Sequence, residues 1–402
     1  MARRLTAAAA ASPAQTPGAV GNPQPEPALL PGGDTALSRL REELGLRGVP
    51  QAILSSSETL ANLAGYELPW EDWPVADPFT AAPPLLLVQA ERCVLVVPTL
   101  FATYAEGTGC DVVETRTHRF RGTPPDPYAE LATTLASLPL QPGPTGVEGR
   151  SLPARAADLL RARGCELVWV DSLVAKSRLV KSEAEVEAVR NASRLADVIQ
   201  AAVKEYAVPG QSEAELAGIA QTAMYRAAGR RVPAILTLNA GEATAYGSTI
   251  PQARTLEPGD LVLTDTSPWF CGAWSDTANT IVVGKPTREH RTVFDALRRT
   301  LDLAISLCRP GAVAGTVDAR VRASLEDWGS ARYQHHTGHG IGASWCERPL
   351  MVPGSTDRIA EGMVLAAEPA IYRPGWGCMR LEHVFLVGSG GNELLSEFEH
   401  TL

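Results

Sequence analysis

The sequence lacks long hydrophobic runs, closely spaced cysteine pairs and an excess of basic residues, and each absence excludes a class of protein. No apolar stretch approaches the roughly 18 residues that a membrane-spanning helix requires, so we expect no membrane partner. The seven cysteines are scattered without Cys-x-x-Cys spacing, which predicts no disulfide framework and fits a reducing cytoplasm. The formal net charge of -9 disfavours nucleic acid as a partner, because phosphate binding requires a basic surface.

The composition is that of an ordinary globular protein with a biased N-terminal arm. Of the 402 residues, 45% are hydrophobic and 20% are charged, and the length predicts two to three domains. Residues 1–34 are rich in Ala, Pro, Gly and Gln, and we expect this arm to be disordered. Arg3 and Arg4 precede an alanine run without leucines, which makes a poor signal peptide, so we predict a cytoplasmic location.

Two segments between Leu256 and Gly388 follow the same pattern. In each, an apolar strand carries an acid six residues after a turn glycine, and a loop leads to a second strand with another acid. A histidine flanked by glycines lies between the two segments. The first segment supplies Asp265 and Asp276, the second supplies Glu368 and Glu382, and the histidine is His339.

A metal centre is the physical interpretation of these five side chains. An acid at the end of an Ile, Val and Leu strand is expected to be buried, and a buried carboxylate is unstable without a positive partner. Arg380 lies nearby in sequence but cannot neutralise four acids. Each acid alone would be interpreted as a solvated turn residue. The matched spacing instead predicts two divalent ions, which activate water and polarise a carbonyl for hydrolysis. Mn²⁺ suits the oxygen-rich ligands best, with Zn²⁺ and Co²⁺ as alternatives.

These motifs resemble those of the pita-bread metallopeptidases, the family of methionine aminopeptidase, aminopeptidase P and prolidase. The resemblance is strong over residues 175–402 and weaker over the preceding domain, which is similar to that of creatinase and prolidase. It implies an α+β protein with a smaller α/β creatinase-like domain at 35–174, after the arm at 1–34. A pita-bread catalytic domain of duplicated αβ half-barrels would follow at 175–402. The resemblance also implies a homodimer.

The resemblance assigns a role to each residue of the metal centre. It implies that the ligands are Asp265, Asp276, His339, Glu368 and Glu382. Glu368 would also be the general base, passing a proton from the attacking water to the leaving amine. His335 corresponds to a second histidine of the family, four residues before His339, which contacts the substrate or orients a ligand. We expect the adjacent His336 to be a polar neighbour in the loop without such a role.

The chain departs from the family pattern at two substrate-contacting positions. Ser248 stands where relatives carry a histidine upstream of the first acid strand, and Cys346 stands where relatives carry one seven residues after His339. In the family these histidines hold the substrate carbonyl, so their loss is expected to lower turnover by about 10² to 10³ without affecting the ligands. We expect both residues to face the substrate, and we do not expect Cys346 to be a nucleophile because no obvious base adjoins it.

Other side chains are candidates for the substrate pocket. Arg380 shares a strand face with the last acid, where we expect it to hold a ligand carboxylate, with a substrate carboxylate as the alternative. Tyr372, Trp345 and Trp376 are candidates for an apolar slot that accepts a proline ring, with core packing as the alternative. The Trp70 to Trp73 segment is interpreted as a loop anchor, with contact to a partner's pocket as the alternative.

The local pattern predicts alternating helices and strands ahead of a long helix. Residues 85–89 and 93–97 have the composition of two strands joined by a short turn, which predicts a hairpin. Ser182 and Glu185 have the spacing of a capping box, so a long helix is expected to begin there. Apolar spacing predicts further helices at residues 36–44, 152–163 and 212–228.

The predicted function is metal-dependent removal of an N-terminal residue ahead of proline. Xaa-Pro dipeptides are the favoured substrates, and aminopeptidase P activity on longer Xaa-Pro-Xaa peptides is the first alternative. A second alternative is creatine amidinohydrolase, which works without metal and lacks the full ligand set. A third is a non-catalytic protein that binds peptides, which the two missing histidines motivate. The five filled ligand positions argue against the last two.

Overall fold

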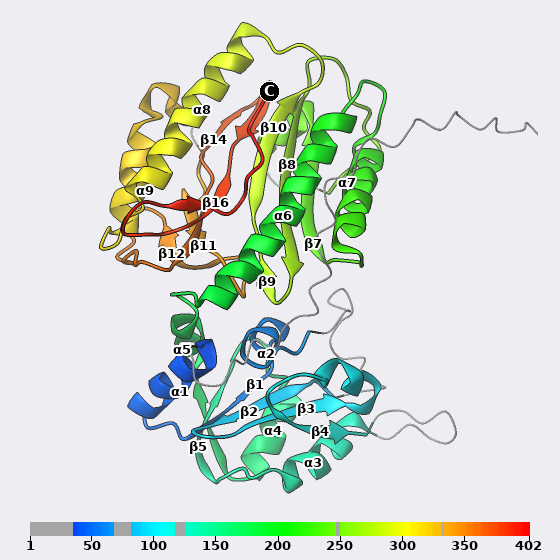
Figure 1. Cartoon of the computed structure of the whole chain (residues 1–402), viewed down its shortest axis with the longest axis vertical. Coiled ribbons are helices and arrows are strands. Elements are labelled where there is room, and N and C mark those ends of the chain that lie inside the picture. Colours follow the sequence, from blue (N-terminus) through cyan, green and yellow to red (C-terminus); the bar gives the residue numbers. More distant parts are fainter. Residues whose placement is uncertain (1–34, 68–81, 117–125, 247–249, 332) are drawn as a thin grey trace, which may run out of the picture.

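The chain folds into two α/β bodies, drawn one below the other in Figure 1. The computed structural model describes residues 35–67, 82–116, 126–246, 250–331 and 333–402. The arm at 1–34, the Trp70 to Trp73 segment and Ser248 lie outside these residues, so the predictions made for them are not tested by the structure. None of the helices in the described part of the chain combines the length and the apolar character needed to cross a membrane.

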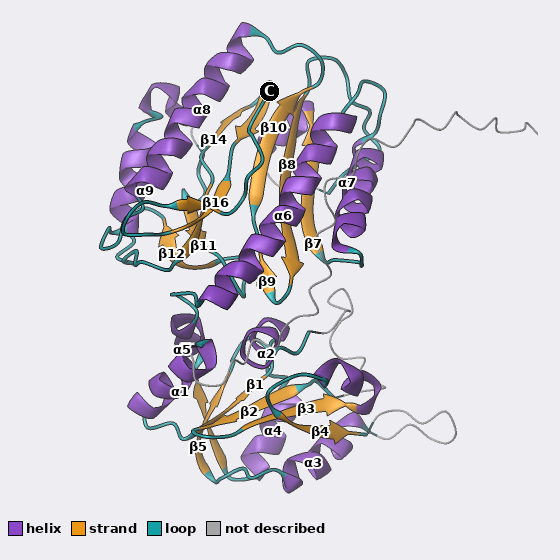
Figure 2. Ribbon diagram, viewed as in Figure 1, coloured by secondary structure: helices purple, strands orange, loops and turns teal. Residues whose placement is uncertain are grey.

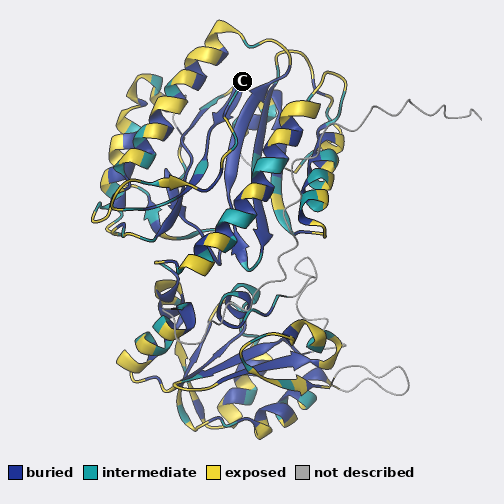
Figure 3. Ribbon diagram, in the orientation of Figure 1, coloured by how far each residue is buried: buried dark blue, intermediate teal, exposed yellow. Residues whose placement is uncertain are grey.

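The N-terminal body is built on one mixed six-stranded sheet in the order β4-β3-β2-β1-β5-β6. The strands are β1 (Gln51–Leu54), β2 (Leu85–Gln89), β3 (Cys93–Pro98), β4 (Asp111–Thr115), β5 (Gly143–Val147) and β6 (Cys165–Trp169). β2 runs antiparallel to β1 and β3, whereas the remaining neighbours are parallel. The predicted hairpin is therefore confirmed as β2 and β3. All residues of β1 and β3 are buried, as expected for strands covered on both faces (Figure 3).

Helices cover both faces of this sheet. One apolar core joins the sheet to α1 (Ala36–Leu46), α2 (Ser57–Ala64) and α5 (Asp171–Ser177), and a second core joins the other face to α3 (Pro127–Ser137) and α4 (Ala154–Ala162). A 3-10 turn, η1 (Thr99–Ala105), follows β3. The helices predicted at 36–44 and 152–163 are confirmed as α1 and α4. α3 was not predicted, although Pro127 at its first position and the Asp126 cap are typical of a helix start.

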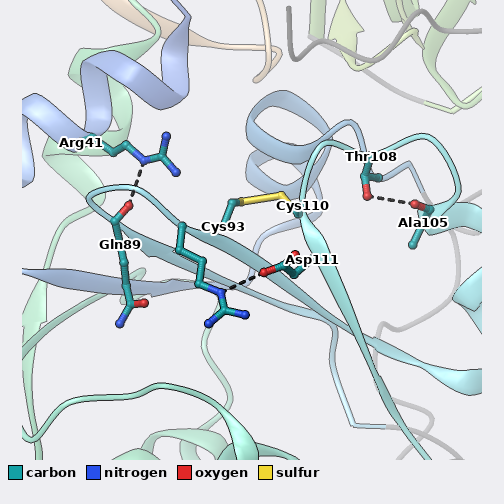
Figure 4. Close-up of a disulfide and its surroundings, with 8 residues drawn as sticks. Arg41, Gln89, Cys93, Ala105, Thr108, Cys110 and Asp111 are labelled. Carbon is teal, nitrogen blue, oxygen red and sulfur yellow. Dashed lines mark hydrogen bonds and ion pairs between the residues drawn. A yellow bond between two sulfur atoms is a disulfide. The ribbon is translucent and has the colours of Figure 1, made fainter. Parts of the chain in front are cut away.

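A disulfide between Cys93 and Cys110 closes the β3–η1–β4 unit (Figure 4). Cys93 begins β3 and Cys110 directly precedes β4, and Val94 pairs with Asp111 in the parallel ladder between these strands. Asp111, the residue after Cys110, lies beside the disulfide in Figure 4 and forms an ion pair with Arg92 at 2.9 Å. The expectation that the scattered cysteines form no disulfide was therefore wrong for this pair, because a parallel strand return brings together residues that are 17 positions apart. The other five cysteines are free.

The first half of the C-terminal body packs two helices on a twisted sheet (Figure 2). The helices are α6 (Glu183–Tyr206) and α7 (Glu213–Ala228), and the strands are β7 (Ala234–Ala240), β8 (Leu261–Phe270), β9 (Ala273–Trp274) and β10 (Thr277–Val282), with the 3-10 turn η2 (Gly241–Tyr246). The capping box of Ser182 and Glu185 is confirmed at the start of α6. β8 lies between β7 and β10 and is antiparallel to both, and one core joins the three strands to α6 and α7.

The second half repeats this plan with its own helices and strands. It contains α8 (Arg288–Leu307), α9 (Ala314–Ala323) and η3 (Glu326–Ala331), then β11 (Gly338–Gly340), β12 (Glu347–Met351), β13 (Val364–Ala367), β14 (Ala370–Arg373), β15 (Gly377–Arg380), β16 (His383–Leu386) and β17 (Glu393–Leu394). The sheet order is β12-β11-β13-β16-β17, and β14 pairs with β15. α8 and α9 pack on the largest apolar core, which reaches both halves.

Hydrogen bonds join the two halves where the acid-bearing strands meet. The Arg380 backbone N–H donates to the Thr280 hydroxyl at 3.0 Å, and that hydroxyl donates to the Arg380 carbonyl at 3.3 Å. The Glu382 N–H donates to the Ala278 carbonyl at 2.9 Å. These bonds place the β10 segment of the first half directly beside the β15 and β16 segments of the second.

Removing the disulfide is expected to destabilise the N-terminal body. Replacing both cysteines (Cys93→Ser with Cys110→Ser) frees a loop of about 17 residues in the unfolded chain and should lower the free energy of unfolding by about 3 kcal/mol. Denaturant melts with and without dithiothreitol measure this, and reductant should destabilise the wild type but not the double variant. Thiol titration of the denatured, unreduced chain should count five thiols. A count of seven would contradict the pairing.

Candidate metal centre

Strand pairing brings the four predicted acids together. Asp265 lies within β8, opposite Ala278 of β10, and Asp276 directly precedes β10. Glu368 directly follows β13 and Glu382 directly precedes β16, and these two strands are antiparallel neighbours. Each half therefore supplies two acids from one hairpin-like strand pair, and the hydrogen bonds between the halves bring the pairs face to face.

Close packing around His339 explains its glycine neighbours. β11 is the short strand Gly338–Gly340, inserted between β12 and β13. A Cβ atom on Gly338 would lie 2.1 Å from the Ala366 carbonyl oxygen, and one on Gly340 would lie 2.3 Å from the Arg348 carbonyl oxygen. Both neighbours are backbone atoms of adjacent strands, so no larger side chain fits at either position. The glycines thus allow His339 to enter the sheet deeply enough to face the acids.

The ligand atoms lie at distances that suit a shared cation. His339 Nε2 is 3.6 Å from Asp276 Oδ2 and 3.7 Å from Glu368 Oε1. One ligand atom each from Asp276, His339 and Glu382 fall within 4.8 Å of one another. His336, His339 and Glu368 form a second such group. All four predicted acids and His339 therefore belong to one cluster, in which Asp265 is linked to Glu368 through Arg380.

The surroundings of Asp265 and Glu382 have a deficit of positive charge. Burial raises the pKa of Asp265 to about 7, and the neighbouring Asp276 and Glu368 add to this, although Arg380 opposes it. Burial and the charge of Asp276 also raise the pKa of Glu382 well above its usual range. Glu382 is 1% exposed, and its Oε1 is buried without a hydrogen-bond partner among the described residues. A buried acceptor oxygen without a donor requires either a proton or a cation.

For Glu368 and His339, the effect of neighbouring groups on the pKa outweighs the effect of burial. Burial alone would raise the pKa of Glu368, but the hydrogen bond from His336 and the charge of Arg380 lower it to about 2, so this carboxylate is ionised. Burial alone would lower the pKa of His339, but its contact with Asp276 and the charge of Glu368 raise it to about 9. His339 Nδ1 lies 2.9 Å from the Gly340 carbonyl oxygen, so Nε2 is the nitrogen that faces the acids.

Arg380 is held by ligand side chains. Its guanidinium is paired with Asp265 Oδ2, lies 3.8 Å from Glu368 Oε2, and donates to the Tyr372 hydroxyl. Burial alone would lower the pKa of Arg380, but Tyr372 and the two carboxylates raise it well above its usual value. Arg380 thus contacts two of the predicted ligands, and its role towards a metal ion or a substrate stays a prediction.

His335 and His336 approach Glu368 from the same loop. His336 Nε2 is 2.6 Å from Glu368 Oε1, and His335 Nδ1 is 3.6 Å from Glu368 Oε2. Burial lowers the pKa of His335 to about 4, so its ring is neutral at physiological pH. The expectation that His336 is only a polar neighbour in the loop missed this direct contact. Sequence spacing offered no signal for it, because both histidines lie in a loop whose conformation does not follow from a regular repeat.

A pinned loop explains why both rings face inward. Arg322 donates to the Tyr333 carbonyl at 2.9 Å and to the His335 carbonyl at 2.5 Å. The Thr337 hydroxyl donates to the buried Asp318 carboxylate at 2.6 Å, and the Glu368 N–H donates to the Thr337 carbonyl at 2.9 Å. α9, which carries Asp318 and Arg322, therefore fixes the loop on both sides of His336.

The remaining predicted contacts are distributed around the cluster. The Trp345 ring lies 6.0 Å from the His339 ring. Trp345 is 44% exposed, so it borders the cluster on a side that solvent can reach. Cys346 is half-buried, and burial raises the pKa of its thiol to about 11, which keeps the thiol neutral. Trp376 packs against His290 and Arg373. It is half-buried against the largest apolar core, which agrees with the packing alternative.

Polar contacts connect the two bodies next to Trp345. The Ser344 hydroxyl donates to Glu58 of α2 at 2.9 Å, and Arg178 bonds to Thr59 of α2 and to the Ser344 hydroxyl. Lys181 and Glu347 form a buried ion pair at 3.0 Å. The N-terminal body is thereby attached to the loop that carries Trp345 and Cys346.

The fold and the buried ligand set define a metal-dependent hydrolase. The chain belongs to metallopeptidase family M24, whose model matches residues 187–389, and the model of the creatinase/prolidase N-terminal domain matches residues 37–180. These matches confirm the predicted pita-bread family and its α+β fold class. The domain boundary at residues 174 and 175 stays a prediction.

Relatives and solved structures of the same kind are similar to the chain along most of its length. A probable dipeptidase PepE of Mycobacterium tuberculosis is 32% identical over 281 residues, which cover 69% of this chain and 73% of that protein. An Xaa-Pro dipeptidase of Pyrococcus horikoshii is 30% identical over 242 residues, 59% of this chain and 68% of the relative. The crystal structure of dipeptidase PepE from Mycobacterium ulcerans is 27% identical, with a TM-score of 0.73 over 91% of this chain and 96% of that one.

Removing metal should make the stability of the protein fall with rising pH. In the ion-free protein the pKa values of Asp265, Glu382 and His339 lie above their unfolded values of about 4 for acids and about 6.5 for histidine. The folded state therefore binds protons more tightly, and stability is lost as pH rises through the folded pKa values. The Tm of protein treated with chelator should fall between about pH 6.5 and 8.5.

Metal should abolish this dependence, because cations replace the protons and His339 releases its own on binding. Parallel thermal melts with chelator and with Mn²⁺ measure the effect. A Tm in chelator that stays constant or rises across this interval would contradict the charge balance described here.

Proposed function

We propose that this chain hydrolyses the peptide bond before proline in Xaa-Pro dipeptides, using two divalent ions. The convergence of four carboxylates and His339 carries the proposal, together with a buried Glu382 oxygen that has no partner in the described part of the chain. The ligands would be Asp265, Asp276, His339, Glu368 and Glu382. Mn²⁺ is the ion that we propose first, with Zn²⁺ and Co²⁺ as alternatives.

The relatives' names support the choice of substrate. Several proteins similar to this chain are named Xaa-Pro dipeptidase, including those of Pyrococcus horikoshii and Lactobacillus delbrueckii. Structures of aminopeptidase P and X-Pro aminopeptidase are similar in fold, at 18% and 17% identity, and support the fold alone. We therefore propose the dipeptidase activity ahead of cleavage of longer peptides. The homodimer and the cytoplasmic location stay predictions.

The ions, when bound, supply an activated water and polarise the substrate carbonyl. Glu368 is ionised and lies at the centre of the cluster, so it is placed to accept a proton from the attacking water. As the C–N bond breaks, the same carboxyl group returns that proton to the prolyl nitrogen. The products are a free amino acid and proline, and Glu368 is again ionised.

Tyr372 is our candidate for the donor that replaces the two missing histidines. Arg380 donates to the Tyr372 hydroxyl, so this oxygen acts as acceptor and its own proton is available for another acceptor. Burial raises the pKa of Tyr372, which keeps the phenol protonated. His335 is less suited to donate through Nε2, because its Nδ1 lies 2.7 Å from the His336 carbonyl oxygen and must carry the proton to bond it. A substrate oxyanion is the acceptor that we propose for Tyr372.

The Glu368→Gln variant tests the general base. Proton transfer by a placed side chain contributes about 10² to 10⁴ in rate, so kcat on Ala-Pro or Met-Pro should fall by at least about 10². Glu361→Gln, an exposed acid that bonds Ser389 in the same half, is the matched control and should keep wild-type activity. Metal content is measured in both variants to separate proton transfer from ion loss. Similar rates for Glu368→Gln and wild type, at equal metal content, would refute the assignment.

The Tyr372→Phe variant tests the proposed donor. Loss of one hydrogen bond to a developing oxyanion should lower kcat by about 10² with a smaller change in KM. Tyr104→Phe in η1 is the control, since Tyr104 lies in the N-terminal body and is 41% exposed. An unchanged kcat for Tyr372→Phe would exclude this role. If wild-type protein releases no first residue from Ala-Pro, Met-Pro or Xaa-Pro-Xaa peptides in Mn²⁺, Co²⁺ or Zn²⁺, the dipeptidase proposal itself fails.

A further inference from the structure

We propose that His336 is an additional metal ligand, which gives one of the two ions a second imidazole beside His339. The five ligands expected from the sequence include a single histidine, and His336 is not among them. The inference rests on the metal centre described under the proposed function, but not on the identity of the substrate.

The positions of three ligand atoms carry the inference. His336 Nε2 lies 2.6 Å from Glu368 Oε1, and His339 Nε2 lies 3.7 Å from the same oxygen. The three atoms all fall within 4.8 Å of one another. With bonds of about 2.0 to 2.2 Å, two ligands of one ion stand about 3.0 to 3.5 Å apart. Small side-chain rotations therefore suffice to place both imidazoles and Glu368 around a single cation.

The two rings are oriented so that each can present a nitrogen to this cation. The rings of His336 and His339 are 5.1 Å apart and nearly perpendicular, at 80°. His339 Nδ1 is engaged by the Gly340 carbonyl, which leaves Nε2 for the ion. His336 also presents Nε2, and its ring is 28% exposed, so an ion can exchange at this side of the cluster.

The backbone around His336 is fixed without help from a metal. Arg322 donates to the His335 carbonyl, and Thr337 bonds to Asp318 through its hydroxyl and to Glu368 through its carbonyl. The residues on either side of His336 are therefore held in place, His335 by α9 and Thr337 by α9 and Glu368. A ligand whose backbone is placed in advance loses less entropy when it binds an ion.

His335 does not satisfy the same conditions. Its Nδ1 lies 2.7 Å from the His336 carbonyl oxygen, and its Nε2 lies 3.5 Å from the Arg380 guanidinium. Both nitrogens thus have partners outside the carboxylate cluster. Of the two adjacent histidines, only His336 directs a nitrogen at hydrogen-bond distance to a predicted ligand oxygen.

A second imidazole predicts a preference among metals. Nitrogen ligands favour Zn²⁺ and Co²⁺ relative to Mn²⁺, which prefers oxygen. Loss of a group that binds or orients a metal costs about 10- to 100-fold in affinity. The His336→Gln variant should therefore bind Zn²⁺ and Co²⁺ at least about tenfold more weakly, with a smaller change for Mn²⁺. Glutamine keeps a hydrogen-bond donor for Glu368, so the comparison isolates the imidazole.

The experiment measures metal binding to the full-length protein. Isothermal titration with Zn²⁺, Co²⁺ and Mn²⁺ compares wild type, His336→Gln and the control His290→Gln. His290 occupies the third position of the capping box of α8, and glutamine preserves that motif. The control should bind all three ions as the wild type does. Thermal melts of the metal-free proteins establish that each variant folds.

X-ray absorption at the Zn edge tests the wild type without any substitution. With two ions bound, the average number of imidazoles per ion should be one if His336 and His339 both bind. It should be one half if only His339 binds. An average of one half, or unchanged Zn²⁺ and Co²⁺ affinity in a folded His336→Gln variant, would show that His336 only donates a hydrogen bond to Glu368 and would overturn the inference. If the wild type binds no divalent ion at all, the metal centre itself fails, and this outcome is distinct from the others.

Discussion

The burial of four carboxylates in one cluster is the constraint on which the rest of this structure depends. Among the described residues, Arg380 and the imidazoles of His336 and His339 contact the acids, and they leave at least one buried oxygen of Glu382 without a partner. Carboxylates this close cannot all ionise without further positive charge. The apolar strands that carry them are therefore compatible with a stable fold only if protons or cations complete the cluster.

Strand register supplies the acids, and close backbone packing supplies the histidine. The two acid-bearing strand pairs meet through short bonds between Glu382 and Ala278 and between Arg380 and Thr280. Gly338 and Gly340 allow β11 to lie against β12 and β13 at distances that no Cβ atom tolerates. The geometry of the centre is thus held by backbone contacts, which a change of side chains elsewhere on the surface leaves intact.

The sequence alone predicts the acids because their spacing is local. Gly259 and Gly362 each precede an acid by six residues, and this spacing can be recognised in the sequence without knowledge of the fold. The contact of His336 depends on Arg322 and Asp318, which lie more than ten residues earlier on a separate helix. The disulfide likewise depends on a parallel strand return, which no spacing rule reveals. Local patterns were predictable, whereas contacts set by packing of distant elements were not.

Two histidines of the family pattern are absent from this chain, whereas His336 lies beside the proposed general base. Serine and cysteine stand at positions 248 and 346, where the family pattern has histidines, while His336 places an imidazole beside Glu368. A neutral imidazole on an ion leaves its net charge unchanged, whereas another carboxylate would reduce its power to polarise a carbonyl. If His336 is a ligand, it lowers the electrophilicity of the ion less than a further carboxylate would. Tyr372, whose hydroxyl oxygen accepts a hydrogen bond from Arg380, is the proposed donor to the substrate oxyanion in place of these histidines.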